Sequence, residues 1–117
     1  MPVEMGRAEF ERLVDDALDS IPEEIARLIR NVAVIVEDDA PPGDPDLLGL
    51  YEGVALTERY GEPGVVLPDR IFVYRNPLLD FCDDMEQLAE EIRITVVHEV
   101  AHHFGIDDAR LDELGYA

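Results

Sequence analysis

The sequence predicts a single α+β domain in which a small mixed sheet packs against helices. Three observations lead to this fold class. Apolar residues recur at intervals of three and four near the amino terminus and again in the last third of the chain, which is typical of helices that bury one face. Short runs rich in Val, Ile and Phe lie between these regions and are typical of strands. The length of 117 residues suits one domain, residues 1–117, with a hydrophobic core.

The first two predicted elements are helices. Residues 7–19 carry an apolar stripe that includes Phe10 and Val14. A second helix is predicted to start at Pro22 and to end near Asn31. Proline is tolerated in a first turn, and the two glutamates that follow it favour the positive end of a helix dipole.

The middle of the chain is predicted to form strands and turns. Residues 32–36, VAVIV, predict a central strand covered on both faces, and a loop rich in proline and aspartate follows at 38–46. Further strands are predicted at 48–56, 65–67 and 71–74.

A long helix near the carboxyl terminus follows these strands. A turn at 60–64 separates two of them, and Pro77 is expected to end the last one. The longest periodic segment then covers 83–104, and Gly105 lies where the left-handed residue after a helix belongs. A last short helix is predicted at 107–114.

The composition excludes several kinds of partner. The chain has 28 acidic and 9 basic side chains and a formal charge of −19, which repels nucleic acid and anionic membrane surfaces. No apolar run is long enough to cross a bilayer, and the amino terminus does not resemble a secretory signal. The single cysteine, Cys82, excludes an internal disulfide and is expected to be a buried thiol. These features predict a cytoplasmic protein without a nucleic-acid or membrane partner.

The end of the long helix carries a pattern with chemical meaning. His98 and His102 are one helical turn apart, about 40° around the axis, so both imidazoles project from the same face. Two imidazoles at this spacing suit two positions on a tetrahedral zinc ion. Glu99 lies to the side of them, where a carboxylate can take a proton from metal-bound water.

Gly105 and Asp108 extend this pattern to HExxHxxGxxD. Glycine allows a positive φ and a chain reversal that can return Asp108 to the same ion. The metal ligands His98, His102 and Asp108 leave a fourth position open, which is typical of catalytic zinc sites. Asp107 and Asp108 both precede the last short helix, so either residue also qualifies as its N-cap.

Three other side chains near the motif have more than one interpretation. His103 lies away from the ligand face and is expected to pack or to support the site. Tyr51 has glycine neighbours that would let its strand approach the site. Tyr116 is either a surface aromatic or a group that stabilises an oxyanion.

The motif resembles that of the zincin metallopeptidases, in the metzincin-like form that has aspartate as its third ligand. Residues 47–53, 68–78 and 90–117 are similar to the small bacterial minimal zincins, and the resemblance covers the chain from about Asn31 onward. It implies a compact fold with the metal helix packed on a small sheet, a Zn²⁺ cofactor and peptide hydrolysis. Metzincins also have a methionine turn after the third ligand, whereas the last methionine here is Met85.

The sequence therefore predicts a zinc-dependent metallopeptidase with Glu99 as the general base. Its expected substrate is a peptide or an unstructured protein, held in extended form by a neighbouring strand. The alternative is a zinc-binding scaffold or regulatory module without proteolysis, which the missing methionine turn favours. A zinc-type ribonuclease is a third interpretation, and the negative charge opposes it.

Overall fold

The computed structural model describes residues 4–53 and 68–116. The predicted turn at 60–64, the predicted strand at 65–67 and the end of the segment 48–56 lie outside these ranges. In chain order the described elements are α1 (Arg7–Asp19), α2 (Glu23–Ala26), the 3₁₀ turn η1 (Arg27–Ile29), β1 (Val32–Glu37), β2 (Gly49–Glu52), β3 (Asp69–Tyr74), α4 (Arg75–Phe81), α5 (Met85–Phe104) and α6 (Asp108–Glu113).

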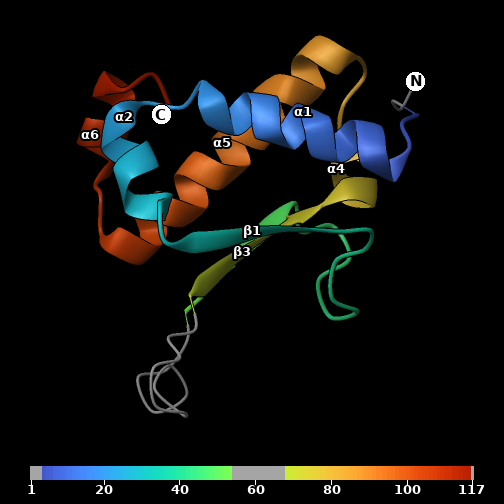
Figure 1. The fold of residues 1–117 in the computed structure, drawn as a ribbon, viewed down its shortest axis with the longest axis horizontal. Helices are drawn as coiled ribbons and strands as arrows, with labels where there is room; N and C mark the ends of the chain where they lie inside the picture. The colour runs from blue at the N-terminus through green and yellow to red at the C-terminus, as the bar shows by residue number, and fades with distance from the viewer. Residues whose placement is uncertain (1–3, 54–67, 117) are drawn as a thin grey trace.

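The described strands form a mixed sheet with helices against it, as the fold class predicted. The strand order is β1-β3-β2, with β1 parallel and β2 antiparallel to β3. Ile71 of β3 lies opposite Val34 of β1 and Tyr51 of β2, so these three residues share one row across the sheet. Helices α1, α2 and α5 lie on the same side of the sheet in Figure 1.

The prediction of 32–36 as a central strand covered on both faces was wrong for the described sheet. β1 is an edge strand there, and β3 is in the middle. Only Val36 of the predicted run is buried, whereas Ile71 and Val73 of β3 are fully buried. The helices cover one face of the sheet, so a run of apolar residues in β1 does not mean burial on both sides.

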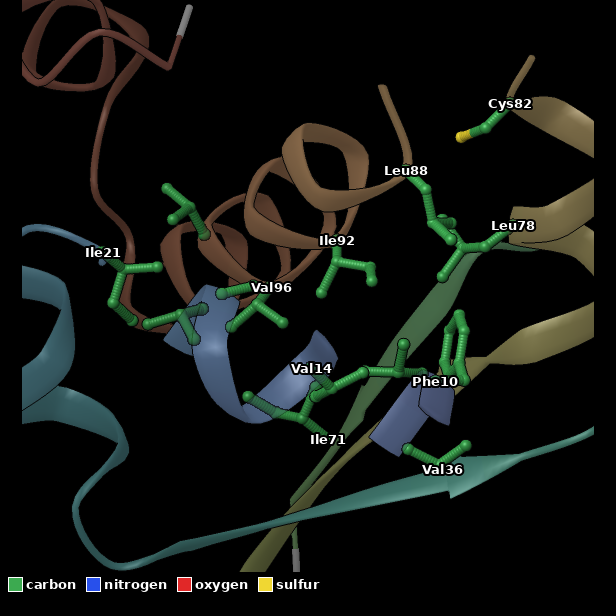
Figure 2. Close-up of a cluster of buried hydrophobic side chains, with 14 of the residues drawn as sticks. Phe10, Val14, Ile21, Val36, Ile71, Leu78, Cys82, Leu88, Ile92 and Val96 are labelled. Atoms are coloured by element: carbon green, nitrogen blue, oxygen red, sulfur yellow. The ribbon is translucent and has the colours of Figure 1, made fainter. Parts of the chain in front are cut away.

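The core fills the space between the helices and the sheet. Figure 2 shows Phe10 and Val14 of α1, Ile92 and Val96 of α5 and Ile71 of β3 in one cluster. Phe10, Ile71, Ile92 and Val96 have no exposed surface. Burial of each such side chain contributes about 1.5–3 kcal/mol to folding. This packing fixes α5, and with it the motif, on the sheet.

Helix α4 was missed by the sequence prediction, which took Pro77 only as the end of a strand. Pro77 is the third residue of α4, where a backbone N–H has no partner within the helix, so proline is tolerated. Leu78 and Leu79 of this helix are buried in the core. Cys82 follows and is buried as predicted, and its burial raises the pKa of the thiol to about 11.

The long helix α5 ends where the sequence predicted and begins at Met85, two residues after the start of the predicted segment 83–104. The Asp84 side chain caps the amino-terminal end by accepting a hydrogen bond of 2.7 Å from the backbone N–H of Gln87. Gly105 ends the helix with φ of 71°, in the left-handed region that glycine adopts without strain. Within residues 4–53 and 68–116, none of the helices is both long and apolar enough to span a membrane.

Candidate functional site

The histidine motif lies on the last two turns of α5, next to the turn at Gly105. His98 and His102 are one helical turn apart, and their rings have an edge-on arrangement with centroids 6.3 Å apart. The side chain of His102 is 72% exposed, whereas His98 is half-buried. The Nε2 atom of His98 lies 2.6 Å from the backbone carbonyl oxygen of Tyr116, so the carboxyl-terminal segment contacts this imidazole directly.

The side chain of Glu99 extends from α5 to strand β2 at the edge of the described sheet. Its side chain is 23% exposed, and its Oε1 atom accepts a hydrogen bond of 3.1 Å from the backbone N–H of Tyr51. Its Oε2 atom lies 3.9 Å from Nδ1 of His102. One carboxylate oxygen is therefore held by strand β2, and the other faces the histidine side of the helix.

Asp107 and Asp108 occupy different positions at the start of α6. The Asp107 side chain is the N-cap and accepts a hydrogen bond of 2.9 Å from the backbone N–H of Arg110. Asp108 is the first helical residue and is exposed. The capping role that the sequence left open between the two residues thus belongs to Asp107.

Helix α6 is tied to α2 by one arginine. The guanidinium of Arg110 donates to both carboxylate oxygens of Glu24, with Nε–O distances of 3.1 and 2.9 Å, and also contacts Glu113. The hydrogen bond from Arg110 lowers the pKa of Glu24, and the two carboxylates raise the pKa of Arg110. Bidentate pairing gives this contact a defined geometry, and it joins α6 to α2, which lies beside it in Figure 1.

A second group of side chains adjoins the motif. The Tyr51 hydroxyl donates a hydrogen bond of 2.7 Å to Oδ2 of Asp69, and its ring stacks on His103 with centroids 3.9 Å apart. Phe104 contacts the edges of both rings. The glycines around Tyr51 were the sequence signal that its strand would come close to the motif. Asp69 was missed, because nothing in its local sequence distinguishes it from an ordinary residue at the start of a strand.

The three expected metal ligands are not assembled in the described residues. Within residues 4–53 and 68–116, no three His, Cys, Asp or Glu side chains lie close enough together to hold a metal ion. His102 lies beside His98 and beside Glu99 as two separate pairs, and the described residues do not place Asp108 with them. The ligand set therefore stays a prediction.

Comparison with known protein families gives a match over most of the chain. The sequence profile of the zincin-like metallopeptidases matches residues 29–116, which contain the three described strands, the motif and α6. The chain belongs to the zincin-like metallopeptidase family.

A solved structure is similar to this zincin-like protein in fold. It is a conserved hypothetical protein from Thermus thermophilus, with 23% sequence identity and a TM-score of 0.59. The alignment covers 90% of this chain and 99% of that chain, so the similarity extends over the whole domain. A search of curated proteins gives no significant match.

Zinc is the metal that a zincin-like family implies. The side chains of the proposed ligands can be compared with the donor atoms that zinc prefers. Imidazole nitrogens and carboxylate oxygens are ligands that zinc prefers. His98 and His102 fit this chemistry, because they are donors of the right type on one face of a rigid helix. Asp108 fits by type and not by its position in this zincin-like structure.

Proposed function

We propose that this zincin-like protein is a zinc-dependent peptidase that cleaves peptides or unstructured proteins. His98, His102 and Asp108 would hold the metal. Glu99 would act as the general base. Zinc, when bound, supplies a Lewis acid that polarises a peptide carbonyl and makes water easier to deprotonate.

The position of Glu99 is the observation that carries this proposal. The carboxylate is partly shielded from solvent, and Tyr51 holds only its Oε1 atom. The Oε2 atom faces His102, which is the side where the proposed metal donors lie. A carboxylate held in this way can take a proton from the attacking water and later deliver it to the leaving amine.

The edge strand β2 supports a substrate of extended shape. It is at an edge of the described sheet next to Glu99, and a strand in such a position can bind a peptide backbone as an added strand. The Tyr51 N–H already donates to Glu99, so a substrate backbone would pair with other groups along β2. The charge of −19 favours peptides that are not strongly acidic.

Zinc content and cleavage test this proposal together. Protein purified without chelator or added metal should contain one zinc per chain and should cleave members of a peptide library. Replacing Asp108 with Ala should lower zinc affinity by more than about 100-fold, since a direct ligand matters more than the groups around it. Asp112→Ala is the matched control, because Asp112 is also an exposed aspartate of α6, and it should bind zinc like the wild type.

Other outcomes of this experiment would contradict parts of the proposal. Equal zinc affinity in the Asp108 and Asp112 variants would exclude Asp108 as a ligand. Zinc binding without cleavage of any peptide, together with a stable bound partner, would support the non-proteolytic scaffold instead.

The contact between Tyr116 and His98 is expected to oppose metal binding. The Nε2 atom of His98 donates to the Tyr116 carbonyl, so it carries the ring proton and can bind a metal only after the contact breaks. A chain that ends at Leu114 should therefore bind zinc about five- to tenfold more tightly, which corresponds to the loss of one competing hydrogen bond. Isothermal titration with zinc at constant pH measures this change.

Tyr116→Ala is the matched control for that truncation. It removes the half-buried ring and keeps the backbone carbonyl that contacts His98. Its zinc affinity should equal that of the wild type. An unchanged or lower affinity of the truncated chain would show that the contact does not compete with the metal.

A further inference from the structure

Tyr51 joins the edge of the sheet to the end of α5 through three different parts of the residue. Its backbone N–H donates to Oε1 of Glu99 at 3.1 Å. Its ring stacks on His103 at an interplanar angle of 19°. Its hydroxyl donates to Oδ2 of Asp69 at 2.7 Å. One residue of β2 therefore contacts the proposed base, a second side chain of the same helix and the first residue of β3.

The backbone bond to Glu99 does not interrupt the pairing of the strands. Tyr51 lies opposite Ile71 in the antiparallel pair of β2 and β3. Alternate residues of an edge strand point their N–H groups away from the partner strand, and the N–H of Tyr51 is directed to Glu99. A hydrogen bond from a rigid strand fixes the distance and direction of the accepting oxygen, and a charged acceptor strengthens it.

Contacts of the Tyr51 side chain hold this residue in place. The Asp69 side chain is 14% exposed, and its Oδ2 atom also lies 3.9 Å from Nε2 of His103. A Cβ atom at Gly53 would lie 3.3 Å from Cε1 of His103, so the absence of a side chain there leaves room for the imidazole. The stacked rings thus lie where β2, β3 and the end of α5 meet.

We propose that Tyr51 is a positioning residue for Glu99, and that Asp69 and His103 act on Glu99 through Tyr51. This inference rests on the proposed role of Glu99 as the base. A general base works only when its free oxygen stays within hydrogen-bond reach of the proton that it takes. The bond from Tyr51 holds Oε1 on the strand and leaves Oε2 beside His102 for that task.

Hydrogen exchange of the metal-free protein tests the contact without any need for activity. The amide of Tyr51 should exchange at least about tenfold more slowly than an unbonded edge amide. Glu99→Gln keeps a carbonyl oxygen as acceptor and should keep this protection, whereas Glu99→Ala should lose it. Glu90→Ala is the control, since Glu90 is an exposed glutamate of the same helix. Equal protection in Glu99→Ala and the wild type would overturn the proposal.

Tyr51→Phe tests the part of the proposal that concerns Asp69. It removes the hydroxyl that contacts Asp69 and keeps both the ring and the backbone N–H. The amide at position 51 should then exchange about threefold to tenfold faster, because the strand is held less firmly. Unchanged exchange would show that Asp69 does not act through Tyr51.

A pair of substitutions at Tyr51 separates the effect of the backbone N–H from the effect of the ring. Tyr51→Ala and Tyr51→Pro both lack the ring and the hydroxyl, and only proline also lacks the N–H. Proline is tolerated on an edge strand where the N–H does not enter the ladder. The kcat for peptide cleavage should be about 10- to 100-fold lower for Tyr51→Pro than for Tyr51→Ala. KM should agree within about twofold, because the N–H of Tyr51 is bonded to Glu99 and does not pair with the proposed substrate backbone.

Zinc affinity separates a failure of this inference from a failure of the proposed function. Both Tyr51 variants should bind zinc as tightly as the wild type, since the contact acts on Glu99 and not on the proposed ligands. Equal kcat values in the two variants would exclude the positioning role. If the wild type cleaves no peptide, the proposed function fails, and the exchange experiment still decides whether Tyr51 holds Glu99.

Discussion

Replacing Glu99 with Gln is expected to lower kcat for peptide cleavage by about 10²- to 10⁴-fold, which is the usual contribution of a general base. Glutamine has the shape of glutamate and cannot take a proton at neutral pH. It still offers a carbonyl oxygen to the backbone N–H of Tyr51, so the bond that holds this side chain in the structure is kept. The loss therefore reports on proton transfer and not on the fold.

Cleavage of a peptide library and zinc content measure this prediction. Zinc content should be unchanged in Glu99→Gln, because Glu99 is not among the proposed ligands. Glu90→Gln is a matched control, since it makes the same chemical change at an exposed position of α5, and it should keep full activity. Activity in the Glu99 variant near that of the wild type would contradict the base mechanism.

Replacing Gly49 with Ala is expected to lower the free energy of unfolding by about 3 kcal/mol, at the upper end of the usual cost of overpacking. A Cβ atom at Gly49 would lie 2.5 Å from Cγ2 of Thr95 and 2.9 Å from the backbone oxygen of Phe72. Thr95 is in the buried part of α5, and the Phe72 oxygen belongs to the central strand. The Phe72 oxygen cannot move without a shift of the sheet, and the Thr95 methyl group belongs to a buried β-branched side chain that has few alternative rotamers.

Urea unfolding measures this effect as a lower midpoint with an unchanged m-value. Gly43→Ala is the control, because a Cβ atom there has no neighbour within 4 Å, and its stability should change by less than about 0.5 kcal/mol. Adding Thr95→Ser to Gly49→Ala removes one clashing methyl group and should restore part of the loss. A Gly49→Ala variant as stable as the wild type would contradict the close contact of β2 with α5.

The same contact links the stability of the domain to the proposed site. Gly49 and Tyr51 are on one four-residue strand, and the first lets the strand approach the helix while the second bonds to Glu99. A shift of β2 away from α5 should therefore weaken both the core and the hold on Glu99. Glycine inside a strand marks either a bulge or a close backbone approach, and Gly49 marks a close approach.

Local patterns in the sequence predicted the two longest helices well. The stripe through Phe10 and Val14 matches α1, and the periodic segment that ends at Gly105 matches α5. These elements follow from the period of 3.6 residues and from the ability of glycine to adopt a positive φ. Both are properties of neighbouring residues, and tertiary packing is not needed to read them.

The errors concern features that depend on what packs around a segment. β1 was predicted to be central, and only the order of the strands shows that it is at the edge of the described sheet. The helix that contains Pro77 was missed, because proline both ends strands and is tolerated in a first helical turn. Local sequence does not distinguish these two uses of proline.

The sequence by itself determined that His98, Glu99 and His102 share one end of one helix, because their spacing equals about one turn. Only the tertiary structure decided which groups meet them. Tyr51 reaches Glu99 from 48 positions away, Asp69 meets Tyr51 from the next strand, and the Tyr116 carbonyl contacts His98. Such contacts depend on how the sheet and α6 pack against α5, and that packing is set by buried side chains throughout the chain.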